Sequence, residues 1–222
     1  MKRPLLVTCL SCLCGLTALS QSNDNSFRRS TYIKVNPTTL INELEVSIEQ
    51  ELNEKLSLEL AVSGIYTDYP DYILAKKIDF GQKKPDISTE QFVDGRGLGF
   101  KAALRWYLFS QKDETLFRAQ GTYFQTVLFF RKVFYPNEDV TLNNIKYKES
   151  ADKDVYGLQL LLGRQIRKDK FIIDPYIGIG VRAKVYNYRN FNDNNGTVQA
   201  NDGRLVSILP SLHLGVKLGL KM

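Results

Sequence analysis

Between Phe171 and Tyr188 the chain alternates between two kinds of side chain, and this pattern limits the possible folds more than any other feature of the sequence. A period of two is the period of a β-strand, whose successive side chains point to opposite faces. The stretch is far longer than the roughly 5–6 residues of an ordinary strand, which favours a strand of a transmembrane barrel. From Pro175 onward one face is aliphatic, with Ile177, Ile179, Val181, Ala183 and Val185, and the other carries Tyr, Gly, Arg and Lys.

The same alternation recurs along the chain and predicts an all-β fold of eight strands. Short turns follow the second, fourth and sixth strands, and long polar loops follow the third, fifth and seventh, at 67–94, 135–151 and 187–203. This order of connections is typical of an eight-stranded antiparallel up-and-down transmembrane β-barrel, with short periplasmic turns, longer outer loops and both termini periplasmic. The expected strands cover 32–35, 42–52, 56–66, 96–109, 116–134, 155–166, 171–188 and 205–222.

The first twenty residues have the organisation of a secretory signal peptide. Lys2 and Arg3 form a positive segment, an apolar run follows, and Ala18 and Ser20 supply small residues for cleavage after Ser20. The apolar run is too short to be a spanning helix. The sequence therefore predicts a signal peptide at 1–20, a flexible periplasmic leader at 21–30 and an outer-membrane β-barrel at 31–222.

Cysteine usage and charge exclude several functions. All three cysteines, Cys9, Cys12 and Cys14, lie in the expected signal peptide, so the remaining chain has no thiol for a disulfide, for catalysis or for zinc. Loss of Lys2 and Arg3 lowers the net charge from +6 to +4, and the remaining basic residues are mixed with acids. We therefore expect no nucleic-acid partner and no metal or other cofactor.

Alternation alone does not say which face of the strands is outward. Two groups of aromatic residues, one at each expected end of the strands, are what a bilayer selects at its two surfaces, and they favour an apolar face toward lipid. The expected group at the short turns is Trp106, Tyr107, Phe109, Phe117 and Phe171, and that at the long loops is Tyr66, Tyr69, Phe129, Phe130, Phe134, Tyr186 and Tyr188.

Charged residues of the polar face then belong to a narrow interior. Eight strands enclose only enough space for side chains, so buried charges there need partners of opposite sign. This predicts a charge network that fixes the barrel, with an ion pathway as the alternative. The acids are Glu43, Glu45, Glu49 and Glu59, and the cations are Lys101, Arg105, Arg118, Arg182 and Lys184.

Seven short segments carry a resemblance to a known family: YIKVN at 32–36, LEV at 44–46, KLSL at 55–58, LRWYLF at 104–109, GLQL at 157–160, YIGIGV at 176–181 and GVKL at 215–218. They resemble the small eight-stranded outer-membrane barrels of the OmpA/OmpX type, most of all the DUF3575-type barrels of Bacteroidetes-like bacteria. The resemblance implies a Gram-negative outer-membrane protein inserted by the barrel-insertion machinery. Such barrels commonly end in an aromatic residue, whereas this chain ends in Leu-Lys-Met, which shifts the expected insertion signal to Leu218 and Leu220.

Three hypotheses for function follow. The first is a non-enzymatic barrel, surrounded by outer-membrane lipid and lipopolysaccharide, that stabilises the envelope or presents its long loops to an external protein or glycan. The second is a lipid A-modifying hydrolase or acyltransferase that uses His213, the only histidine, with Ser211. The expected inward direction of His213 speaks against this enzyme, since its substrate is in the surrounding lipid. The third is a narrow-pore channel.

Overall fold

The computed structural model describes residues 29–68, 77–79, 91, 93–108, 112–113, 116–117, 121–194 and 196–222. The expected signal peptide, nearly all of the leader and most of the loop at 67–94 lie outside this range. So do Arg118 of the expected charge network and three expected girdle residues, Tyr69, Phe109 and, for its side chain, Phe117.

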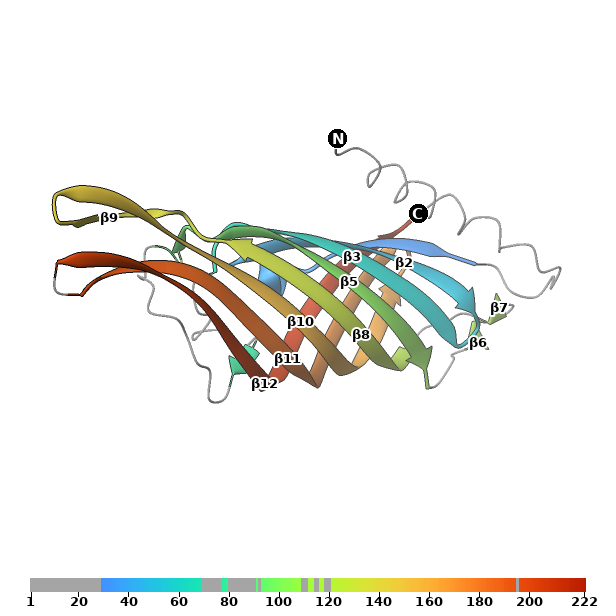
Figure 1. Ribbon diagram of the computed structural model, residues 1–222. Helices are drawn as coiled ribbons and strands as arrows, with labels where there is room; N and C mark the ends of the chain where they lie inside the picture. Colours follow the sequence, from blue (N-terminus) through green and yellow to red (C-terminus); the bar gives the residue numbers. More distant parts are fainter. Residues whose placement is uncertain are drawn as a thin grey trace, which may run out of the picture.

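The chain forms an antiparallel sheet that closes on itself as a β-barrel (Figure 1). Each long strand pairs with the next along the chain, and β1 pairs with β12, from Tyr32 opposite Lys221 to Val35 opposite Leu218. This confirms the all-β, antiparallel and closed parts of the prediction. The strands of the ring are β1 (Thr31–Val35), β2 (Glu43–Asn53), β3 (Leu56–Ile65), β5 (Arg96–Tyr107), β8 (Gly121–Phe134), β10 (Ile145–Lys168), β11 (Phe171–Asn194) and β12 (Thr197–Lys221).

Shorter elements complete the sheet and its connections. The strand β4 (Lys77–Asp79) pairs with β12 beside residues 211–213, and a 3-10 turn, η2 (Pro37–Thr39), follows β1. The strand β9 (Glu138–Leu142) forms a hairpin with β10. Two dipeptides, β6 (Lys112–Asp113) and β7 (Leu116–Phe117), pair with each other.

The barrel has an apolar outside and a polar inside. On β11, Ile177 and Ile179 are 51% and 64% exposed, whereas Arg182 and Lys184 of the opposite parity are buried. The other long strands repeat the pattern: Leu44, Ile48, Leu60, Leu98, Leu128, Leu158, Ile208 and Leu214 are exposed, while Glu45, Glu49, Glu59, Arg105, Gln125, Gln159, Ser207 and His213 are buried. A soluble barrel has the reverse arrangement.

Two of the expected long loops are mostly strand, so that part of the prediction is wrong. In place of loops at 135–151 and 187–203, β9 and β10 form one hairpin, and β11 and β12 pair as far as Asn194 opposite Thr197. These hairpins project beyond the barrel (Figure 1). The short turns after β2 and β10 are as predicted, at 54–55 and 169–170.

Four of the expected girdle aromatics lie on the inner face instead. Tyr107, Phe129 and Tyr186 are buried in the barrel interior, and Tyr188 is partly buried against the cluster that contains Tyr186, because their positions share the parity of the inward-facing charges. Trp106 and Phe171 at one end, and Tyr66 and Phe134 at the other, are exposed on the outer wall as expected.

Candidate functional site

A fully buried arginine, Arg105 of β5, forms the centre of the barrel interior. Its Nη2 lies 2.9 Å from Oε2 of Glu59 and 2.9 Å from Oδ2 of Asp174, and its Nη1 lies 3.2 Å from Oε2 of Glu49. The guanidinium also lies over the ring of Tyr123, 3.8 Å from the ring centre. One cation therefore joins carboxylates from β2, β3 and β11 across the interior.

Two lysines neutralise the negative charge that Arg105 alone does not compensate on these three carboxylates. Lys34 of β1 contacts Glu49 and donates a 2.7 Å hydrogen bond to Asp174, and Lys217 of β12 contacts Glu59. The three carboxylates thus meet three cations, all buried. Buried charges are tolerated when they are paired and hydrogen-bonded in this way.

A second layer lies nearer to the short turns. Arg167 contacts Glu51 at 2.7 Å, and its guanidinium lies over the ring of Tyr32, 4.5 Å from the ring centre. The hydroxyl of Tyr107 donates to Glu49 at 2.8 Å and lies 2.6 Å from Oε1 of Gln165. Side chains from four strands, β1, β2, β5 and β10, thus occupy this cross-section.

Two further ion pairs lie nearer to the long hairpins. Lys101 contacts Glu45, and Arg131 contacts Glu43. Of the residues predicted from sequence, the structure thus brings together Glu43, Glu45, Glu49, Glu59, Lys101 and Arg105 in the interior, each with a partner of opposite charge.

The other predicted cations have different places. Arg182 and Lys184 are buried on the interior face of β11, opposite Leu209 and Ser207 of β12. The four glutamates form ion pairs with Lys34, Lys101, Arg105, Arg131 and Lys217. The sequence prediction omitted Lys34, Glu51, Arg131, Arg167, Asp174 and Lys217, although their parity on each strand is that of other inward residues.

Ser211 and His213 of β12 are hydrogen-bonded to each other. Oγ of Ser211 lies 2.8 Å from Nε2 of His213, and both side chains are buried on the interior face. They lie opposite Gly180 and Gly178 of β11. In serine enzymes, a histidine that is hydrogen-bonded to a serine hydroxyl acts as the base that activates this nucleophile.

A third feature lies at the mouth of the barrel next to the hairpins. Asp68, just after β3, contacts Lys153 and accepts a hydrogen bond from the hydroxyl of Tyr135. Burial alone would raise the pKa of Asp68, but the Lys153 ammonium and these hydrogen bonds outweigh it and hold the pKa below its usual value. Apolar side chains, including Ile65, Val133 and Tyr186, surround this group.

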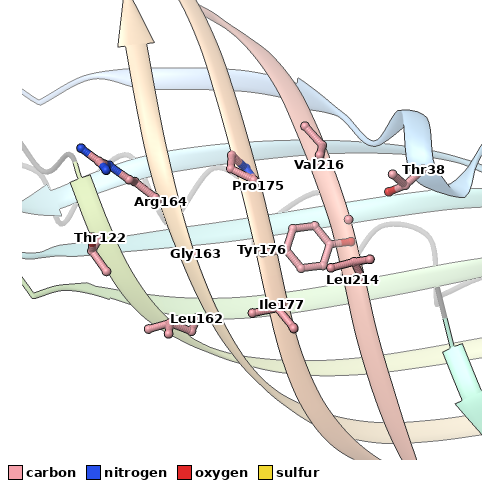
Figure 2. Close-up of a pocket in the computed structure, with 11 residues that line it drawn as sticks. Thr38, Thr122, Leu162, Gly163, Arg164, Pro175, Tyr176, Ile177, Leu214 and Val216 are labelled. Atoms are coloured by element: carbon pink, nitrogen blue, oxygen red, sulfur yellow. The ribbon is translucent and has the colours of Figure 1, made fainter. Parts of the chain in front are cut away.

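The barrel wall carries an apolar hollow of about 730 Å³ that crosses β8, β10, β11 and β12 and reaches Thr38 of η2. Leu162, Ile177 and Leu214 of its lining are exposed on the outer side of the wall. Figure 2 shows Leu162, Ile177 and Leu214 on neighbouring strands, with Arg164 and Thr122 at the end toward β8. Beside the hollow, the pairing of β10 with β11 stops at Gly163 opposite Tyr176 and resumes at Ile166 opposite Ile173. Pro175 lies in this gap, where a missing N–H removes a ladder hydrogen bond.

No protein-family model matches the chain, and a search of curated proteins finds no match either. Within the described residues, no helix is both long and apolar enough to cross a membrane. Among the same residues, no group of three or more His, Cys, Asp and Glu side chains is placed to hold a metal ion.

Proposed function

We propose that this chain is a non-enzymatic outer-membrane β-barrel. It stabilises the envelope or presents its β9–β10 and β11–β12 hairpins to partners outside the cell. The eight strands of the ring form the transmembrane wall, and residues 1–20 are removed as a signal peptide. As part of this proposal, the chain is related to the small OmpA/OmpX-type barrels, and most of all to the DUF3575-type barrels. The observation that carries it is the apolar exterior around an ion-paired interior.

The apolar exterior of the barrel supports the proposal that lipid surrounds it. Full exposure of a Leu or Ile side chain to water, in place of burial, costs about 1.5–3 kcal/mol, and Leu and Ile side chains that are roughly half exposed lie along the outside of the long strands. Monomeric soluble proteins rarely expose a continuous apolar surface of this kind. Several strands also exceed the roughly 9–11 residues needed to cross a bilayer at a tilt.

The interior supports a structural role over transport. Arg105, its three carboxylates and the two lysines join opposite walls of the barrel. An ion would have to displace paired side chains that are fully buried, and the cluster of Ile65, Val133, Tyr135 and Tyr186 lies at the mouth above them.

The hairpins support presentation to an external partner. Tyr147 of the β9–β10 hairpin stacks on Phe191 of the β11–β12 hairpin, with ring centres 4.8 Å apart. Oε1 of Glu149 accepts a 3.0 Å hydrogen bond from the backbone N–H of Phe191. The two hairpins therefore form one ordered surface, which suits recognition of an external protein or glycan.

The test is the behaviour of the full chain in cells and in detergent. We expect the protein in the outer-membrane fraction, β-type circular dichroism, and faster gel mobility before heating than after. A soluble-fraction location, or a helical or random spectrum in detergent, would reject the proposal.

The Ser211–His213 hydrogen bond favours a second candidate, a lipid A-modifying hydrolase or acyltransferase. Lipid A mass spectra from wild-type and His213→Ala cells separate the two. The structural proposal expects identical spectra. An acyl chain whose presence changes in the variant, and returns to normal with the wild-type gene, would support the enzyme instead.

A further inference from the structure

The apolar hollow on the outer wall combines two kinds of surface. Leu162, Ile177 and Leu214 supply an apolar floor, and Arg164 supplies a positive charge at one end (Figure 2). Its volume of about 730 Å³ falls within the roughly 300–1,000 Å³ of small-molecule sites. The complementary ligand is one that is apolar along its length and anionic at its end.

Arg164 is unusual for its place on the wall. It is exposed and shares the outward face of β10 with the apolar Leu162 and Ile166. A lipid-facing arginine is costly at the middle of a bilayer and almost free of cost at its surface. Arg164 lies four residues before Lys168, where β10 ends at a short turn, so the proposed orientation puts it near the periplasmic surface.

Neighbouring groups suit a phosphate at this position. Thr122 of β8 lies directly opposite Arg164 and adds a hydroxyl donor. A guanidinium binds phosphate oxygens through paired, charge-assisted hydrogen bonds. The gap in the β10–β11 ladder beside Pro175 adjoins the same end of the hollow.

We propose that the hollow binds one glycerophospholipid of the periplasmic leaflet. Its phosphate contacts Arg164 and Thr122, and one acyl chain lies against Leu162, Ile177 and Leu214. The inference rests on the proposed membrane location and adds a selective lipid site to it.

The test is native mass spectrometry of the full chain released from nanodiscs. The nanodiscs contain equal amounts of phosphatidylglycerol, phosphatidylethanolamine and diacylglycerol with the same acyl chains. We expect adducts of both phospholipids and about tenfold less of the diacylglycerol, which lacks the phosphate. Arg164→Gln should lower the phospholipid adducts to the diacylglycerol level, whereas Arg204→Gln, at an exposed arginine of β12 outside the hollow, should not.

A second pair of variants tests the acyl-chain position. Ile177→Trp should fill the hollow and remove the adducts, while Ile179→Trp, on the same face of β11 but outside the lining, should keep them. Equal retention of diacylglycerol, unchanged adducts in Arg164→Gln, or a lipid-free dimer would overturn the lipid site. A chain that inserts into nanodiscs without this selectivity contradicts the site alone, whereas a chain that does not insert contradicts the proposed function.

Discussion

At the scale of single residues, Arg105 shows how the interior is held together. Its guanidinium contacts Glu49, Glu59 and Asp174 at 2.9–3.2 Å, and all four side chains are buried. A buried charge that loses its partner is far more destabilising than an exposed one, because water cannot replace that partner. Arg105 therefore contributes to stability mainly because its removal would deprive Glu49, Glu59 and Asp174 of a cationic partner.

Replacing Arg105 should destabilise the barrel strongly. We expect Arg105→Met to lower the free energy of unfolding by about 3–5 kcal/mol, since it leaves excess buried negative charge. Urea unfolding of the folded chain in detergent measures this. The matched control is Arg189→Met, because Arg189 pairs with Asp202 on the exposed hairpin and its loss should change little. Addition of Asp174→Asn to Arg105→Met should restore part of the loss, and equal midpoints for Arg105→Met and Arg189→Met would contradict the role of the network.

Asp68 should make stability depend on pH only in the acid range. Its pKa is lower in the folded chain than the value of about 3.9 in an unfolded one, because Lys153 and Tyr135 stabilise its charged form. Such a carboxylate stabilises the fold fully above about pH 4 and loses this effect as pH falls through the lower, folded pKa. The difference in unfolding free energy between wild type and Asp68→Asn should be constant from pH 5 to 7 and shrink below pH 4. A difference that grows on acidification would refute the assignment.

The sequence predicted an inward face for charges such as Glu59 and Arg105, but not which charges meet. Alternation along a strand fixes the face, and it correctly directs Glu59 and Arg105 inward. Contact also depends on height in the barrel, which comes from the register between strands far apart in the chain. For this reason Lys217, 158 residues after Glu59, contacts it, a pairing that no local pattern could predict.

At the scale of elements, cross-strand pairs of glycine and an aromatic residue shape the wall. In each pair the ring lies where the β-carbon of the opposite residue would be, so only glycine fits. In such pairs the ring covers the backbone that glycine leaves exposed, and the pair fixes the register of the two strands. The pairs are Tyr123 with Gly163, Phe129 with Gly157, Tyr176 with Gly215 and Tyr188 with Gly203.

A side chain at Gly163 should conflict with Tyr123. The ring of Tyr123 is held by a 2.7 Å hydrogen bond to Asp174 and by Arg105, so it cannot move aside easily. We expect Gly163→Ala to destabilise the barrel by about 1–3 kcal/mol, measured by urea unfolding in detergent.

Two further variants test the cause. Gly64→Ala is the control, because a β-carbon at Gly64 would meet no atom within 4 Å. Combination of Gly163→Ala with Tyr123→Ala should cost less than the sum of the two single changes. Additive effects would mean that the ring and the glycine are not coupled.

The strands of the wall were predictable because one of their faces is apolar and the other is polar. The hairpins beyond it were not, since they are rich in Asn, Asp, Lys and Glu and carry only short apolar alternations, such as Ile145 and Tyr147 alternating with lysines. A turn signal was nevertheless present at Asn143 and Asn144, which have φ values of 55° and 63°. Asparagine tolerates this left-handed region, and two such residues favour a tight hairpin.

At the scale of the whole molecule, the interior network predicts a barrel without a conducting pathway. We expect planar-bilayer recordings of the purified chain to show little steady current, because paired side chains from opposite walls fill the cross-section. Arg189→Met should behave like wild type, since the exposed hairpin lies away from the interior. Large, stable currents from the wild-type protein would support the narrow-pore channel instead.

The ring closes through its smallest strand, which spans only Thr31–Val35 and pairs with residues 218–221. The two halves of this seam are separated by nearly the whole chain, and contacts between such distant segments carry the largest loop-closure entropy and form slowly. We therefore expect closure to come late in folding, and it requires residues 218–221. Any product that stops short of residue 218 keeps an open strand edge, which invites pairing with other chains. In this way the seam distinguishes chains that contain residues 218–221 from shorter products that lack them.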